Sequence, residues 1–165
     1  MKKLLALILA VALMATMSVT AFATDNTVNY NGSETPQTSE LKVAYSVTPT
    51  FSVTIPANVA LGNSVTVSAA DVVVEYGKAV NVKLSGTSET DNSFMLRTEQ
   101  GAELSYTVKK GEAAVNVGDT ILSVIPGSDE TSAELTFVEP ASYTYAGLYK
   151  GTVTCTIAVE AAGNN

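Results

Sequence analysis

The side chains that could carry chemistry in this sequence are carboxylates, tyrosines and one cysteine, because histidine and tryptophan are absent. Without imidazole, neither a Ser-His-Asp nor a Cys-His nucleophilic system can be built. The single thiol, Cys155, cannot supply the cluster of imidazole or thiolate ligands that zinc and copper need. No glycine-rich phosphate loop stands between a strand pattern and a helix pattern. The sequence therefore predicts no cofactor and no transition-metal site.

Carboxylate pairs remain the one route to acid–base catalysis, as in glycoside hydrolysis. Most acidic residues fall in turns or at polar positions of alternating runs, where a solvated surface charge is the simpler interpretation. These candidates are Glu75, Asp91, Glu99, Glu103, Asp119, Asp129, Glu130 and Glu139. Asp129, Glu130 and Glu134 leave calcium as an alternative, although calcium loops usually carry denser and more regularly spaced oxygen ligands. We predict that the protein is not an enzyme and holds no metal.

Three tyrosines, Tyr143, Tyr145 and Tyr149, cluster near one expected strand end. Exposed aromatic rings of this kind can form a sugar-binding platform, so a glycan-binding module is one candidate function. Tyr149 also has a structural interpretation. Gly147 permits a sharp entry into a strand, and the Tyr149 hydroxyl can bond back to an upstream backbone group, as in the tyrosine corner of Greek-key sandwiches.

Cys155 lies in the alternating run 152–159, whose odd positions carry the apolar side chains. This phase predicts that the thiol points into the core beside Val153 and Ile157. We expect a buried structural cysteine, with a reactive or intermolecular thiol as the alternative. One cysteine cannot form an internal disulfide, so the core must supply the stability.

Residues 1–23 have the layout of a cleavable secretory signal. Two lysines precede the apolar run 4–14, and Ala21-Phe22-Ala23 has the small-x-small form that signal peptidase recognises. The uncharged stretch 4–23 is 20 residues long, so a retained membrane anchor is the alternative. Because hydroxyl residues dilute its second half, we favour cleavage. The expected location is therefore extracellular or at the cell surface, without stable membrane insertion.

Export would remove Lys2 and Lys3 and leave 7 basic and 16 acidic groups, a net charge of −9. Such a chain repels phosphate backbones and anionic lipid surfaces. We therefore expect no nucleic-acid partner. Removing 23 of the 165 residues leaves 142, which is the size of one ordinary domain with one sizeable core.

The remaining chain divides by composition and period. Residues 24–40 are polar and are expected to form a flexible leader, and 161–165 a short disordered tail. From 41 to 160 the apolar period is two, with turn signals every 8–15 residues and no helical periodicity. The expected strands involve residues 41–47 and 51–55 (one bent strand or two, broken at Pro49), 65–67, 72–74, 80–84, 94–96, 104–108, 121–125, 135–137 and 148–160.

Nine or ten short strands without intervening helices predict an antiparallel two-sheet sandwich. Immunoglobulin-like and jelly-roll strand orders both fit. The turn-forming residues Gly86–Asn92 and Lys109–Glu112 mark two of the expected connections.

Two stretches carry a resemblance to known proteins. Residues 45–57, Tyr-Ser-Val-Thr-Pro-Thr-Phe-Ser-Val-Thr-Ile-Pro-Ala, resemble the first strands of small secreted β-sandwich proteins of Gram-positive anaerobes. Residues 145–154, Tyr-Ala-Gly-Leu-Tyr-Lys-Gly-Thr-Val-Thr, resemble their closing strand and that of spore-coat and fimbrial sandwich subunits. The resemblance implies an adhesin-like, pilin-like or matrix-forming role without catalysis.

Strand addition between copies is the assembly mechanism that this resemblance and the expected unpaired edges favour. Within the leader 24–40, only Val28 and Tyr30 could serve as donor side chains. The candidate partners are therefore further copies of the chain, cell-surface proteins or glycans.

Overall fold

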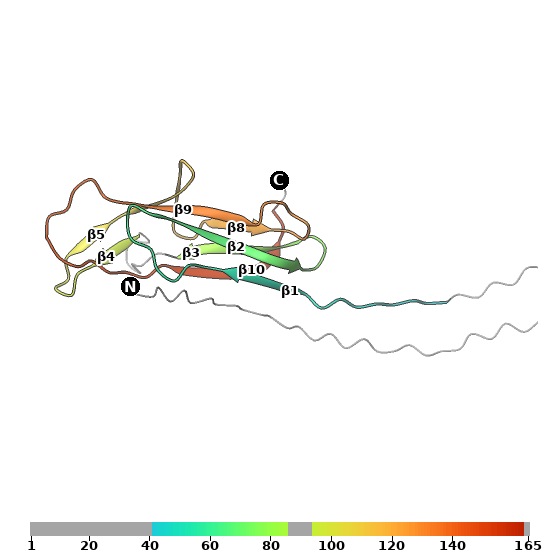
Figure 1. Ribbon diagram of the computed structural model, residues 1–165. Coiled ribbons are helices and arrows are strands. Elements are labelled where there is room, and N and C mark those ends of the chain that lie inside the picture. Colours follow the sequence, from blue (N-terminus) through green and yellow to red (C-terminus); the bar gives the residue numbers. More distant parts are fainter. Residues whose placement is uncertain (1–40, 86–93, 164–165) are drawn as a thin grey trace, which may run out of the picture.

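The structure, a computed structural model, describes residues 41–85 and 94–163. Within these ranges the chain forms ten antiparallel strands and no helix, which confirms the predicted all-β sandwich (Figure 1). The strands are β1 (Thr50–Thr54), β2 (Ser64–Val73), β3 (Lys78–Ser85), β4 (Met95–Arg97), β5 (Glu103–Ser105), β6 (Thr107–Lys110), β7 (Ala113–Val115), β8 (Thr120–Val124), β9 (Ser132–Val138) and β10 (Thr154–Ala161).

Two main sheets form the sandwich. One has five strands in the order β1-β2-β9-β6-β7, and the other has three in the order β10-β3-β8. A separate hairpin of β4 and β5 lies at one end of the molecule (Figure 1). The turn predicted at Lys109–Glu112 is confirmed, because it joins β6 to β7 with Gly111 at a φ of 59°.

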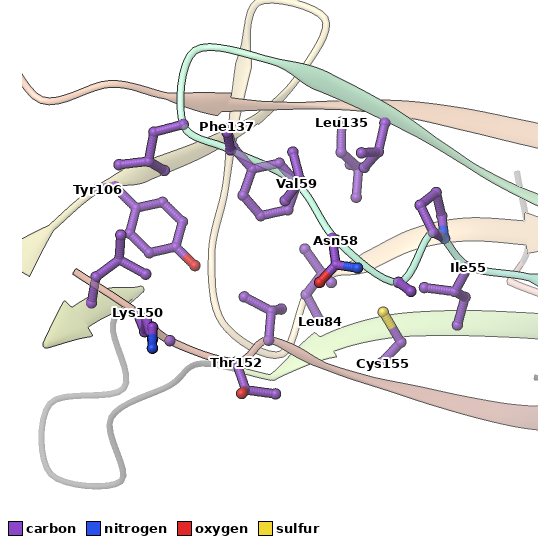
Figure 2. Close-up of a pocket in the computed structure, with 18 of the residues that line it drawn as sticks. Ile55, Asn58, Val59, Leu84, Tyr106, Leu135, Phe137, Lys150, Thr152 and Cys155 are labelled. Carbon is purple, nitrogen blue, oxygen red and sulfur yellow. The ribbon is translucent and has the colours of Figure 1, made fainter. Parts of the chain in front are cut away.

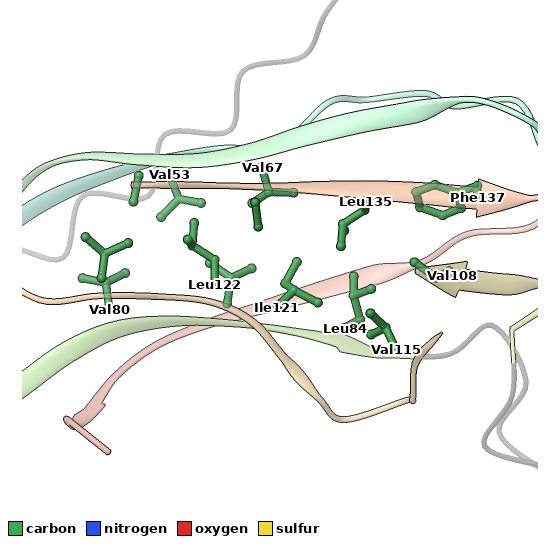
Figure 3. Packing of buried hydrophobic residues seen from close by; sticks show 14 of the residues in the cluster. Val53, Val67, Val80, Leu84, Val108, Val115, Ile121, Leu122, Leu135 and Phe137 are labelled. Atoms are coloured by element: carbon green, nitrogen blue, oxygen red, sulfur yellow. The ribbon is translucent and has the colours of Figure 1, made fainter. Parts of the chain in front are cut away.

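The core fills the space between the sheets (Figure 3). Alternate residues of β3, Val80, Val82 and Leu84, are 0–1% exposed and face the five-stranded sheet. Their β-branched or long apolar side chains suit a pleated surface that is covered by a second layer. Ile121 and Leu122 of β8 complete the same layer and are 1% and 2% exposed. The opposing layer consists chiefly of Val53, Val67, Ala69, Val108, Leu135 and Phe137.

Two predicted strand patterns are wrong in detail at the start of the domain. Residues 41–49 form no strand and are largely exposed, although their apolar residues alternate. The runs 65–67 and 72–74, expected as separate strands, belong largely to the single strand β2, which continues to Val73. The register with β1 shifts between Thr50 and Ser52, opposite Asp71, whose φ is 52°. Such a β-bulge lets a strand continue through a residue in the left-handed region, which aspartate tolerates.

Two later predictions also need correction. The in-phase run 104–108 is divided, because Leu104 pairs with β4 while Val108 pairs with β9 and β7, and buried Tyr106 lies at the break. The last strand begins at Thr154 rather than near Leu148. Before it, Lys150 makes an isolated bridge to Arg97, so this segment is held by β4 rather than by β3.

Several predictions lie outside the described residues: the signal 1–23, the leader 24–40, the loop 86–92 and the last two residues of the tail. Ala161, predicted to start the tail, is the last residue of β10. Within the described ranges, no helix has the length and apolar character needed to cross a membrane.

Candidate functional site

The three tyrosines singled out from the sequence lie on the irregular segment between β9 and β10. Tyr143 and Tyr145 are exposed, by 65% and 63%. Tyr149 is half-buried, and its hydroxyl donates a hydrogen bond to the backbone oxygen of Tyr145 at 2.8 Å. This is the upstream backbone bond that the sequence predicts for Tyr149. The structure therefore leaves two of the three rings available to a ligand.

Two glycines hold this segment close to β4. Gly147 has a φ of 154°, and a Cβ there would lie 3.2 Å from Thr98 Cγ2. It precedes β10 by seven positions, so it permits close packing on Thr98 and does not form the predicted entry into the strand. A Cβ on Gly151 would lie 2.8 Å from both Met95 O and Leu96 Cδ2. Gly151 itself lies in the wall of a groove.

An open groove of about 570 Å³, whose side chains are mainly apolar, lies between the two sheets at this side of the molecule (Figure 2). One wall is the β1–β2 connection, residues 55–61, and the other is the segment 149–155. The floor consists of inner-face side chains from both sheets, namely Val65, Val67, Leu84, Leu135 and Phe137, with Leu96, Leu104 and Tyr106 closing one end. The groove thus reaches the apolar interior of the sandwich.

The groove exists because the edge strands leave this side uncovered. β1 pairs only with Ser68–Val73 of β2, so no described strand pairs with the first half of β2 on the β1 side. β10 pairs with β3 on one side and with no described strand on the other. Four inner-facing residues beside and within β10 are consequently only partly buried: Val153, Cys155, Ile157 and Val159. We call these four residues the β10 edge.

Cys155 faces the groove (Figure 2). The predicted inward phase is confirmed, but the thiol is half-buried rather than enclosed. Partial desolvation raises the pKa of the thiol, which keeps it protonated and weakly nucleophilic at neutral pH. A catalytic thiol would need the opposite shift.

Tyr106 belongs to a buried aromatic cluster and lies at one end of the groove. Its centroid lies 5.8 Å from that of Phe94 and 6.1 Å from that of Phe137. Burial raises the pKa of the Tyr106 hydroxyl from 10.0 to about 12. The hydroxyl therefore stays neutral at physiological pH and is one of the few polar side-chain groups in the groove.

Three of the acidic candidates make contacts within the fold. Glu103 pairs with Arg97 at 2.8 Å, Glu130 with Lys110 at 3.7 Å, and Asp119 accepts a hydrogen bond from the backbone N–H of Asn116 at 2.7 Å. Asp91 lies outside the described residues. No described carboxylate lines the groove, and no three acidic, histidine or cysteine residues among those described gather as a metal site. The calcium alternative at 129–134 thus gains no support.

One polar cluster was missed by sequence reasoning. Glu160 of β10 accepts hydrogen bonds from Lys83 Nζ at 2.8 Å and from Asn81 Nδ2 at 2.9 Å on the outer face of the three-stranded sheet. The hydrogen bond from Lys83, followed by that from Asn81, lowers the pKa of Glu160. Asn81 and Lys83 share a strand face in the sequence, but only the register with β10 reveals their acidic partner. The cluster ties β10 to β3 from outside.

Comparison with known proteins adds no relative. No protein-family model matches the sequence, and no curated protein or solved structure is significantly similar to it. The resemblance at residues 45–57 and 145–154 accordingly stays a prediction. The geometry of the groove and of the β10 edge has to carry the functional argument.

Proposed function

We propose that this chain is a secreted, non-catalytic β-sandwich that acts in extracellular assembly or cell-surface interaction, in the manner of an adhesin, pilin or matrix protein. The observation that carries the proposal is the open apolar groove that continues into the half-covered β10 edge. Apolar side chains at an uncovered strand edge are stabilised when a partner removes them from water, which supports a binding role for this face.

The chemistry of the groove favours a polypeptide partner over a substrate. Its lining is aliphatic and aromatic, with Asn58, Tyr106, Lys150 and Thr152 among the few polar side chains. A groove lined by apolar side chains beside a free strand edge suits β-strand addition, in which backbone hydrogen bonds supply affinity and alternate side chains supply specificity.

The test is the mass of residues 24–165 by light scattering over a wide concentration range in non-denaturing buffer. Assembly predicts oligomers or fibres whose mass rises with concentration. A strict monomer throughout the range would overturn assembly and leave binding of a different molecule as the function of this face.

A glycan-binding module is the second candidate, because Tyr143 and Tyr145 expose their rings on one segment. Titrating a panel of cell-wall and host glycans while following tyrosine fluorescence tests it. Binding should be lost in Tyr143→Ala and Tyr145→Ala but kept in Tyr76→Ala, a matched control at a fully exposed ring. No response across the panel would remove this candidate.

A further inference from the structure

The segment 41–48, which precedes Pro49 and β1, has the side-chain pattern of a strand but pairs with no described strand. Leu41, Val43, Tyr45 and Val47 are 88%, 85%, 90% and 62% exposed. Lys42, Ala44, Ser46 and Thr48 alternate with them. In Figure 1 this stretch runs away from the sandwich in an extended path. Four large apolar groups at period two would all lie on one face of a strand, and the described residues leave all four exposed.

The β10 edge, in contrast, has inward-facing apolar residues that the sandwich does not fully cover. Cys155, Ile157 and Val159 are partly buried, whereas their cross-strand partners Leu84, Val82 and Val80 are 0–1% exposed. The edge strand β1 of the other sheet is better covered, because its inner-facing residues Phe51 and Val53 are only 9% and 3% exposed. The incomplete burial is therefore at β10. A strand added beside β10 would cover the residues that the sandwich leaves half-exposed.

The backbone of β10 is also set up to accept a strand. The N–H of Ala162 donates to Gly77 O at 2.9 Å, continuing the ladder in which Ala161 stands opposite Lys78. Antiparallel ladders bond through every second residue, so the even-numbered residues of β10 bond to β3. The backbone groups of Cys155, Ile157 and Val159 therefore point to the free edge.

We propose that residues Leu41–Thr48 of one copy add as a strand to the free edge of β10 in a second copy. The donor and β10 each contain eight residues, and both span about 26 Å when extended. The four apolar donor side chains cover the β10 edge, and the donor extends toward the groove beside Val153. This inference rests on the assembly function proposed above and names its donor, in place of Val28 and Tyr30 of the leader.

A second copy is required by the connection to β1. Thr50 pairs with Val73, and Ala161 at the end of β10 pairs with Lys78. To reach its own β10, the segment would have to reverse direction and pass from one sheet to the other with only Pro49 as a linker. Sheets pack about 10 Å apart, and even a hairpin within one sheet takes about two loop residues.

The native cysteine provides a direct test. In the chain 24–165, Val43→Cys, Tyr45→Cys and Val47→Cys are made singly, oxidised mildly, and analysed by non-reducing electrophoresis and peptide mass spectrometry. Donor addition predicts a ladder of linked chains, with at least one introduced thiol joined to Cys155 of another copy. Tyr76→Cys is the matched control, because that side chain is fully exposed and lies outside the donor, and it should give no ladder through Cys155.

Aspartate substitutions on the two faces of the donor segment distinguish donor-strand addition from other modes of assembly. Val43→Asp with Tyr45→Asp should raise the concentration needed for assembly by about tenfold or more, since a carboxylate would enter the apolar edge. Ala44→Asp with Ser46→Asp adds the same charge on the opposite face and should leave assembly nearly unchanged. Circular dichroism and thermal unfolding should show all variants folded, because the substituted side chains are exposed in the described structure.

Each alternative outcome overturns a defined part of the argument. If the unmodified chain assembles but both aspartate pairs behave alike and no link to Cys155 forms, the donor-strand inference is wrong while the assembly function stands. A cross-link confined within one chain overturns exchange between copies. An unmodified chain that stays monomeric overturns the assembly function together with the inference.

Discussion

The two strands of one ladder, β3 and β10, differ in how completely the fold covers them. Val82 of β3 is fully buried, while its partner Ile157 on β10 is only partly buried. Both carry apolar side chains at alternating positions and both face the same interior. Among the described strands, β3 has a neighbour on each side, whereas β10 has a neighbour on one side. The alternating sequence pattern therefore determines which side chains point inward. The position of the strand in the sheet determines whether those side chains are fully buried.

The largest expected effect separates the sealed interior from the open edge. Leu122→Ala should lower the free energy of unfolding by about 2–5 kcal/mol, because it leaves a cavity in a region that cannot collapse. Ile157→Ala should cost only about 1–2 kcal/mol, since that side chain is already partly in water. Urea denaturation of both variants under conditions that keep the chain monomeric measures the difference. Equal losses would contradict the distinction between the two strands.

A glycine substitution probes the wall of the groove. Gly151→Ala should cost about 1–3 kcal/mol, because the new Cβ would lie 2.8 Å from Met95 O, a backbone atom with little freedom to move. Gly127→Ala gives no such contact within 4 Å, but its φ of 77° carries backbone strain of its own. Ala146→Ser, an exposed change on the same segment, is therefore the better control. Thermal unfolding that leaves Gly151→Ala unchanged would show that the wall is loose.

Tyr106, at the buried end of the groove, should make the stability of the fold depend on pH in the alkaline range. Its pKa is about 12 in the folded protein against 10.0 as its ordinary value. The stabilisation from this raised pKa is complete below pH 10 and is lost as the pH rises from 10 toward 12. Tyr106→Phe should therefore flatten the decline of the urea midpoint between pH 9 and pH 11.5. Tyr143→Phe, at an exposed ring, should leave the decline as it is.

The smallest expected effect concerns the outer face of β10. The hydrogen bonds from Lys83 and Asn81 hold the pKa of Glu160 below its ordinary value of 4.5. Their stabilisation is present above about pH 4.5 and is lost as the pH falls through the lowered pKa. Glu160→Gln should make stability slightly less sensitive to acid, measured as the urea midpoint at pH 7 and pH 3. Glu112→Gln, at a fully exposed side chain, is the control.

Much of the fold was predictable, because a period of two is a direct consequence of strand geometry. The run 80–84 was predicted to be a strand, and in β3 its apolar residues Val80, Val82 and Leu84 share one buried face. The errors fall where pairing decides the outcome. Residues 41–47 alternate as well as β3 does, but no partner lies beside them in the described structure. The bulge at Asp71 likewise depends on the register with β1.

The candidate site was predictable only in part. Tyr149 was expected to bond to an upstream backbone group, and it bonds to Tyr145 O. The groove could not be foreseen, because its walls come from residues 55–61 and 149–155, nearly a hundred positions apart. Glu160 carried no signal of its own, since its contacts with Asn81 and Lys83 depend on the pairing of β10 with β3.

By itself the sequence determined the chemistry and the inward or outward phase of each strand. The composition, with no histidine and one cysteine, limits the chemistry. The alternation of side chains along an extended backbone determines which residues of a strand point inward. The tertiary structure alone decided which strands became edges. Strand pairing joins residues far apart in the chain, and local preference does not encode it. That pairing left β10 with one described neighbour and left residues 41–48 unpaired with any described strand.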